Sequence, residues 1–155
     1  MLLKNEFDLE TFTYSDTAVR KEIDNNPPPE YQVNLRSLYE DVLLPLKTRL
    51  TTKYAKQIDI QINSGYRSEK LNKAIGGAGK SQHSFGEAAD TVAVGISLPQ
   101  YFKDIVELVD KGALEVDQCI YEFNKWVHIS YRKGKNRKQF LGATKVNGKT
   151  VYNPL

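Results

Sequence analysis

The spacing of apolar residues changes abruptly after the first third of the chain, and this change restricts the folds open to it. Between residues 31 and 50, apolar side chains recur every three or four positions, which predicts an amphipathic helix with one face on a core. Pro45 lies within this segment and is expected to end or kink its regular hydrogen bonding. Residues 58–63 instead alternate apolar and polar side chains, as a half-buried strand does. We therefore expect a main helix packed on a sheet.

The rest of the chain repeats these two patterns. Residues 7–12 are short and mixed, and they are interpreted as an edge strand or an extended arm. Asn147-Gly148 between strand-like runs is a strong hairpin signal. The other predicted elements are strands at 88–94, 116–123, 126–131 and 140–152, and helices at 15–23, 68–75 and 98–111. This order predicts an α+β fold with a central, largely antiparallel sheet and packed helices.

The length of the chain and its single cysteine indicate one domain that is not stabilised by disulfide bonds. The 155 residues fit a single domain spanning 1–155. The chain has one cysteine, Cys119, so no intramolecular disulfide can form. Cys119 lies in a strand-like run without an activating base beside it, and we expect a buried free thiol.

The charge balance excludes some partners. With 22 basic and 19 acidic residues, the net charge of +3 does not predict nucleic-acid binding. No run approaches the ~20 apolar residues of a membrane span, and residues 1–8 lack the pattern of a signal peptide. We expect a monomer, made in the cytoplasm, that binds neither nucleic acid nor membrane. The basic run at 132–138 fits a solvated loop, or a site that attracts an anionic polymer such as a bacterial cell wall or a nucleic acid.

Two histidines and a carboxylate form the candidate metal site. His83 precedes Asp90 by seven residues, with Gly86 between them, and His128 lies in a predicted strand. Two imidazoles and one carboxylate, with a fourth position left for water, are the ligand set of a catalytic zinc. The spacing alone leaves alternatives open: a histidine is often a surface or core group, and Asp90 could cap a strand end.

An ordered set of motifs extends this pattern through the chain. The motifs are Ser64-Gly65-Tyr66-Arg67-Ser68, Leu71-Asn72, the run from Ser81 to Asp90, Glu122, and Trp126-Val127-His128-Ile129-Ser130. Together they resemble the zinc D-Ala-D-Ala carboxypeptidases and phage cell-wall endopeptidases, whose fold is shared with the hedgehog signalling domain. Residues 7–29 and 34–36 also resemble one branch of this family, so the resemblance covers nearly the whole chain.

The resemblance implies a role for each matching residue. His83, Asp90 and His128 match the ligands of a Zn²⁺ ion, which activates a water molecule. Arg67 matches an arginine that binds substrate and stabilises the developing oxyanion; a structural salt bridge is its alternative. Ser81 matches a position that often contacts substrate, and its alternative is a local turn hydrogen bond.

The general base departs from the family pattern. Some branches carry glutamate three residues before the last histidine ligand, where this chain has Lys125, and another carries histidine two before, where it has Trp126. The nearest carboxylate is Glu122, which we assign as the base. A three-residue hairpin loop ending at Trp126 would place Glu122 directly opposite His128. A two-residue loop ending at Lys125 would turn Glu122 to the other face.

The sequence thus predicts a zinc peptidase that cleaves peptidoglycan stem or cross-link peptides containing D-amino acids. Asp117 is a candidate acceptor for a histidine N–H. Tyr66 and Trp126 either line the substrate cleft or belong to the core.

Two other functions stay open: a non-catalytic, zinc-stabilised hedgehog-like binding module, and a phage structural or wall-binding protein that uses residues 132–138. Without a signal peptide, a wall enzyme depends on lysis or another export route.

Overall fold

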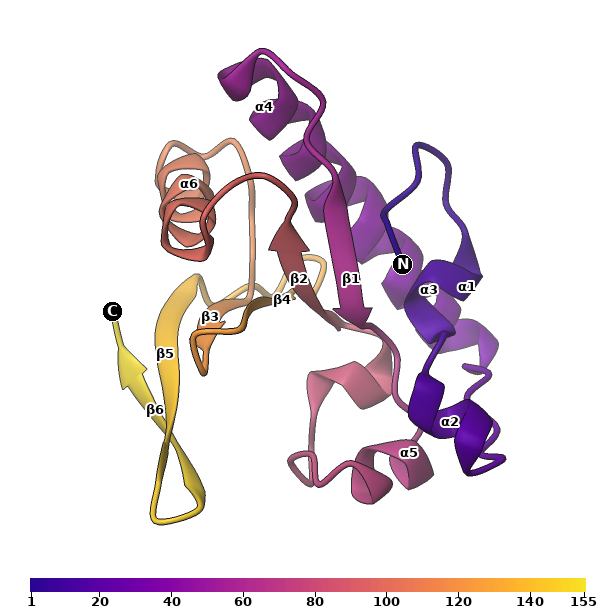
Figure 1. The fold of residues 1–155 in the computed structure, drawn as a ribbon. Coiled ribbons are helices and arrows are strands. Elements are labelled where there is room, and N and C mark those ends of the chain that lie inside the picture. The colour runs from indigo at the N-terminus through magenta and orange to yellow at the C-terminus, as the bar shows by residue number, and fades with distance from the viewer.

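The computed structural model describes all residues 1–155 and contains a six-stranded mixed sheet surrounded by helices (Figure 1). The strands are β1 (Ile60–Ser64), β2 (Ala88–Ala93), β3 (Gln118–Glu122), β4 (Trp126–Ser130), β5 (Gln139–Val146) and β6 (Lys149–Pro154). Their order in the sheet is β1-β2-β4-β3-β5-β6. Every neighbouring pair is antiparallel except β3 and β5, which run parallel. The predicted mixture of helices with a largely antiparallel sheet is confirmed.

The helices lie mostly before and between the strands. They are α1 (Leu9–Thr13), α2 (Asp16–Arg20), α3 (Pro29–Leu38), η1 (Tyr39–Leu43), α4 (Leu44–Tyr54), α5 (Glu69–Ala74), η2 (Gln82–Phe85) and α6 (Leu98–Asp110). None of them is both long and apolar enough to cross a membrane.

Helices α3 and α4 form one continuous rod, and Pro45 neither ends nor breaks it. The turn η1 between them is a π-helix, in which the Leu44 N–H donates to the carbonyl of Tyr39. Pro45 has no N–H to donate and sits in the first turn of α4, where a proline is tolerated. The widened turn lies directly before the proline, and helical structure continues through it.

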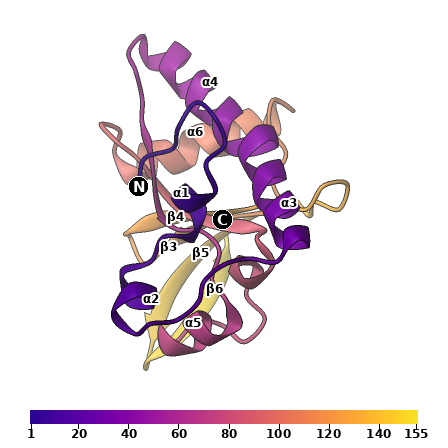
Figure 2. The same ribbon diagram turned by 90° about the vertical axis from the view of Figure 1, so that its right-hand side faces the viewer.

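One face of the sheet packs against the core helices, and the other carries polar side chains. One face carries Ala89, Val127 and Ile129, all fully buried. It packs in the main core with the apolar stripe of α3–α4 and with Tyr101 and Ile105 of α6; Figure 2 shows these helices gathered on one side of the strands. The buried thiol of Cys119 belongs to this core, as predicted. The opposite face, formed by the residues one position along each strand, carries the polar side chains of the candidate site, among them Asp90 and His128.

One predicted element is wrong. Residues 7–12 form no edge strand; α1 begins at Leu9, and the Asp8 side chain caps it by accepting from the Glu10 N–H at 3.2 Å. The outer edge of β1 is covered instead by the first residues of the chain, through a bridge between Leu2 and Gln61. The hairpin at Asn147-Gly148 is confirmed, since these two residues, both with positive φ, connect β5 to β6.

Candidate metal centre

Three segments bring the two histidines and the aspartate together. Asp90 of β2 and His128 of β4 are cross-strand partners, so their side chains leave the same face of the sheet. His83 lies in η2, whose first turn is capped by the Ser81 hydroxyl accepting from the His83 N–H at 3.2 Å. Gly86 ends this turn at φ +71°, and a Cβ there would clash with the carbonyl of Tyr31. Glycine is therefore required where the chain turns from η2 into β2.

The three potential ligand atoms form a nearly equilateral triangle. Asp90 Oδ1 lies 3.2 Å from His83 Nε2 and 3.1 Å from His128 Nδ1, and the two nitrogens are 3.2 Å apart. Tetrahedral zinc with bonds of about 2.0–2.1 Å would need ligand atoms about 3.3 Å apart. All three side chains are buried. The triangle fits one face of such a tetrahedron, which leaves a fourth position for water.

The protonation states suit metal binding. His83 Nδ1 lies 2.7 Å from the carbonyl oxygen of Gly65, so it carries the proton and leaves Nε2 with a free lone pair. Burial lowers the pKa of His83. Burial alone would raise the pKa of Asp90, but the charge and hydrogen bonds of the two histidines hold it well below its usual range. A neutral imidazole and an ionised carboxylate are the forms that bind metals.

The acceptor that orients His83 was missed by the sequence analysis. Asp117 was the predicted candidate, and this prediction is wrong. Its buried carboxylate accepts from Arg137 Nη2 at 2.7 Å and from Gln82 Nε2 at 3.0 Å. The acceptor is instead the main-chain carbonyl of Gly65, directly after β1. A backbone acceptor leaves no signature in side-chain chemistry, so only the fold reveals it.

Glu122 shares the site face, through a register that differs from both predicted ones. It pairs with Trp126, and the loop is residues 123–125, so Ile120 is the partner of His128. Glu122 lies two residues from Ile120, which returns it to the same face, one step along the strand. Its Oε1 is 3.4 Å from His128 Nδ1 and accepts from Trp126 Nε1 at 3.3 Å. Burial raises the pKa of Glu122, and the charge of Asp90 adds to this.

Arg67 and Ser81 lie next to each other beside the ligands. Arg67 Nη2 donates to Ser81 Oγ at a long 3.5 Å, its buried Nε has no partner, and the residue forms no ion pair in the structure. The alternative of a structural salt bridge for Arg67 is therefore not supported. Burial lowers the pKa of Arg67, while the charges of Asp90 and Glu122 oppose that effect. Ser81 does make the local turn bond described above, in addition to facing Arg67.

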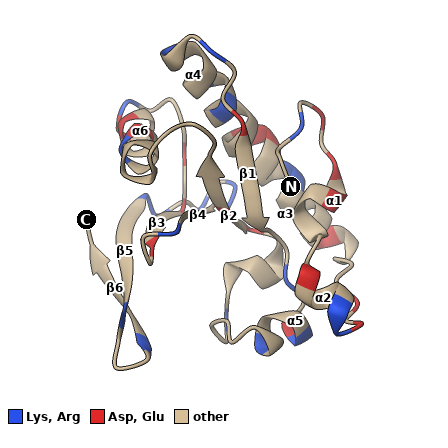
Figure 3. Cartoon of the chain, viewed as in Figure 1, with Lys and Arg blue, Asp and Glu red and all other residues tan.

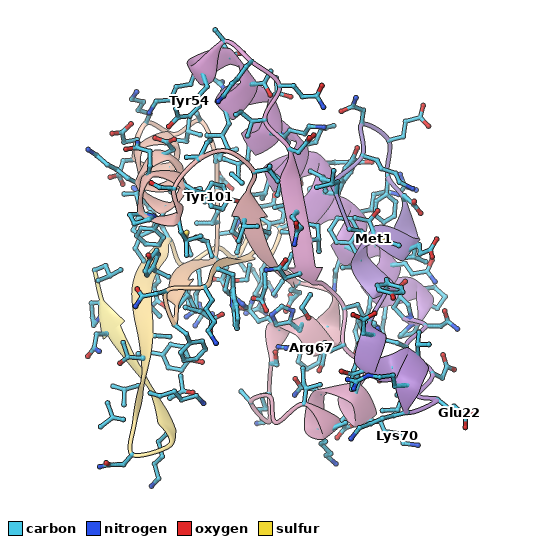
Figure 4. The ribbon with its side chains drawn as sticks, in the orientation of Figure 1. Met1, Glu22, Tyr54, Arg67, Lys70 and Tyr101 are labelled. Carbon is cyan, nitrogen blue, oxygen red and sulfur yellow. The ribbon has the colours of Figure 1, made fainter.

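A cavity of about 460 Å³ opens beside the ligands. Its lining includes Asp90, Arg67 and Trp126, together with residues of β1, α1 and α2. Figure 4 shows Arg67 below the ends of β1 and β2, on the side of α5. Tyr66 both lines this cavity and belongs to the core.

The basic run at 132–138 is largely neutralised by neighbouring acids. Its ion pairs are Arg132 with Glu87 at 3.3 Å, Lys133 with Asp41 at 3.8 Å, Arg137 with Asp117 at 2.7 Å and Lys138 with Asp110 at 3.5 Å. In Figure 3, basic and acidic positions are interspersed over the whole chain. The run therefore does not present a row of free cations to an anionic polymer.

Comparison with known proteins gives one match. The family model described as Peptidase M15 matches residues 5–130, a region that includes His83, Asp90, His128, Arg67 and Glu122. No curated protein and no solved structure matches the chain. Strands β5 and β6 lie beyond the matched region.

Proposed function

The chain belongs to the peptidase M15 family, and from this premise we propose that it is a zinc-dependent peptidase that hydrolyses peptidoglycan stem or cross-link peptides containing D-amino acids. The observation that carries the proposal is the triangle of His83 Nε2, Asp90 Oδ1 and His128 Nδ1, with edges of 3.1–3.2 Å, with the carboxylate of Glu122 beside it. We treat residues 1–155 as one catalytic domain.

The ligand triangle fits Zn²⁺, and each ligand is held by the fold. The β2–β4 register aligns Asp90 with His128, while the Gly65 carbonyl fixes the ring of His83. When bound there, zinc would lower the pKa of a coordinated water toward neutrality and polarise the peptide carbonyl.

Glu122 is the proposed general base. Its Oε1 lies 3.4 Å from His128 Nδ1, one corner of the ligand triangle, and accepts a hydrogen bond from Trp126 Nε1. Burial moves its pKa upward, toward the pH at which a base must first accept and then release a proton. In this role Glu122 accepts the proton of the attacking water and delivers it to the leaving amine.

Arg67 is the proposed anion-binding group. Its guanidinium is half-buried, carries no ion pair, and opens on the same cavity as Asp90. Such a group can donate to a substrate carboxylate or to the oxygen that gains charge during attack. Ser81 is proposed to hold Arg67 and, through it, the substrate.

Of the two alternative functions, wall binding by residues 132–138 is the less supported, because four of the five cations in this run, all except Lys135, form ion pairs within the chain. A non-catalytic zinc module would carry no carboxylate beside the metal ligands. Glu122 occupies that position, which favours the peptidase.

The test is incubation of the zinc-loaded protein with purified peptidoglycan, with and without a chelator, followed by mass analysis of the released fragments. We expect new termini at one peptide bond, loss of cleavage with the chelator, and recovery when zinc is restored. His128→Ala is the control that removes a ligand. If the zinc-loaded protein releases no fragment from stem or cross-link peptides, the peptidase proposal fails.

A further inference from the structure

The C-terminal hairpin brings a tyrosine onto the face of the sheet that bears the metal centre. Tyr152 of β6 is the cross-strand partner of Ala143 in β5, and Ala143 is the partner of Glu122 in β3. Partners in neighbouring strands point to the same face of a sheet. Trp126, Glu122, Ala143 and Tyr152 therefore form one row across four strands. Because Ala143 carries only a methyl group, no long side chain separates Tyr152 from Glu122.

The hairpin stands across the site from the segment that carries Arg67. Figure 1 shows β5 and β6 on one side of the ends of β2 and β4, and α5 on the other. The charges of the site act on the phenol: burial raises the pKa of Tyr152, Glu122 and Asp90 raise it further, and Arg67 opposes them. The phenol is thus close enough to sense all three groups, and it stays protonated near neutral pH.

The hydroxyl of Tyr152 is free to bind a ligand. Buried tyrosines of this chain use theirs internally: Tyr101 pairs with Thr91 at 2.7 Å, and Tyr131 donates to Asp41 at 2.9 Å. Tyr152 forms no such bond, and the residue is 49% exposed. Tyr152 is thus a free donor that feels the charges of Glu122, Arg67 and the metal-ligand candidate Asp90, so it is available to an oxygen of a peptide bound among them.

We propose that Tyr152 is a substrate-binding residue, which donates a hydrogen bond from its hydroxyl to a carbonyl or carboxylate oxygen of the peptide held between Arg67 and Glu122. The proposal rests on the proposed peptidase function. It assigns the β5–β6 hairpin, which lies outside the region matched by the family model, to the wall of the substrate cleft.

The experiment compares two variants that each lose one phenolic hydroxyl from the same sheet. Tyr152→Phe removes the proposed donor. Tyr121→Phe is the matched control, because Tyr121 lies on the opposite face and packs against Phe102 with ring centroids 5.7 Å apart. Initial rates are measured on a digest of purified peptidoglycan, together with zinc content and thermal midpoint. We expect kcat/KM to fall about tenfold in Tyr152→Phe, the effect of one neutral hydrogen bond, and to stay within about twofold in the control.

The outcomes separate this proposal from the proposed function. Cleavage by the wild type, with equal kcat/KM in both variants, overturns the assignment of Tyr152 and leaves the peptidase intact. A fall in Tyr152→Phe that is matched by lost zinc also overturns it, since the tyrosine would then act through the metal site. Absence of cleavage by the wild type overturns both proposals.

Discussion

Glu122 is the residue whose substitution separates chemistry from metal binding. Glu122→Gln keeps the size of the side chain and its contact with Trp126, but it removes the ability to accept a proton. We expect turnover of peptidoglycan peptides to fall by about 10²–10⁴-fold, the usual contribution of a general base. Zinc content should stay at the wild-type level, because Glu122 is not one of the three ligands.

Glu87→Gln is the matched control, since Glu87 is half-buried near η2 but pairs with Arg132 at 3.3 Å. Both variants are assayed for steady-state turnover and for bound metal. Full turnover in zinc-loaded Glu122→Gln would remove Glu122 from the mechanism and leave the water to be activated by the metal alone.

Gly65 holds His83 in place through its backbone, and this can be tested with one methyl group. A Cβ at Gly65 would clash with the backbone of Phe12, so the chain must shift where β1 ends. The carbonyl that binds His83 Nδ1 at 2.7 Å shifts with it. We expect Gly65→Ala to weaken zinc binding by about 10–100-fold, as loss of an orienting partner does.

Titration with a zinc-competing dye measures this affinity. Gly79→Ala is the control, because nothing lies within 4 Å of a Cβ there and φ at Gly79 is not positive. Unchanged affinity in Gly65→Ala would show that the ring of His83 needs no carbonyl to orient it.

At the scale of elements, Asn25 joins the N-terminal helices to the strand end that carries Arg67. Its Nδ2 donates to the carbonyls of Thr13 at 2.8 Å and Tyr66 at 3.0 Å, and its Oδ1 accepts from the Ser68 N–H at 2.7 Å. Two of these bonds fall on the residues directly before and after Arg67. Asn25 therefore fixes the backbone from which the guanidinium extends.

We expect Asn25→Ala to lower the free energy of unfolding by about 1–3 kcal/mol, because it leaves buried backbone groups without partners. We also expect kcat/KM to fall by roughly 10–100-fold as Arg67 loses its position. Chemical denaturation and steady-state kinetics check the two effects. Asn26→Ala, at the exposed neighbouring position, should change neither; a stable Asn25→Ala variant with normal kinetics would contradict the positioning argument.

In the β3–β4 hairpin, the positions of the strands could be predicted from the sequence, but their register could not. The alternation of apolar residues places both strands correctly, and the motifs identify His128 and Glu122. The register could not be derived, because the loop at 123–125 places Phe123 and Asn124 at positive φ, at 55° and 57°. Phenylalanine rarely adopts a positive φ, so the sequence of this loop does not indicate a turn that begins at Phe123. The predicted three-residue loop, which ended at Trp126, nevertheless placed Glu122 on the correct face of the sheet. Its register differs from the observed one by two residues, and a slip of two residues leaves each side chain on the same face.

Over the whole molecule, local patterns were predictable and long-range pairings were not. The amphipathic helices and the Asn-Gly hairpin follow from residues close in sequence, and the three ligand candidates follow from an ordered set of motifs along the chain. The parallel pairing of β3 with β5, the carbonyl of Gly65 and the position of Tyr152 each depend on segments brought together by the fold. Such contacts depend on packing and strand register, and neither can be derived from a local pattern in the sequence.

The last prediction concerns the acid sensitivity of the whole molecule through Asp117. Burial alone would raise the pKa of Asp117, but hydrogen bonds from Arg137 and Gln82 hold it below its usual value. A carboxyl with a lowered folded-state pKa contributes stability above its unfolded pKa of about 3.9, and loses it as the pH falls through the folded value. Asp117→Asn should therefore be less stable than wild type by roughly 1.5–3 kcal/mol at pH 7, with the difference shrinking below about pH 4.

Urea denaturation of wild type and Asp117→Asn at pH 7 and pH 3, with a chelator present throughout, measures the difference in their free energies of unfolding. Groups that titrate equally in the two proteins do not contribute to this difference. Asp110→Asn serves as the control, because Asp110 is exposed and pairs with Lys138 at 3.5 Å; exposed pairs contribute little. A wild-type advantage over Asp117→Asn that is as large at pH 3 as at pH 7 would show that the link between Asp117 and Arg137 depends on shape and hydrogen bonding rather than on the ionised carboxylate.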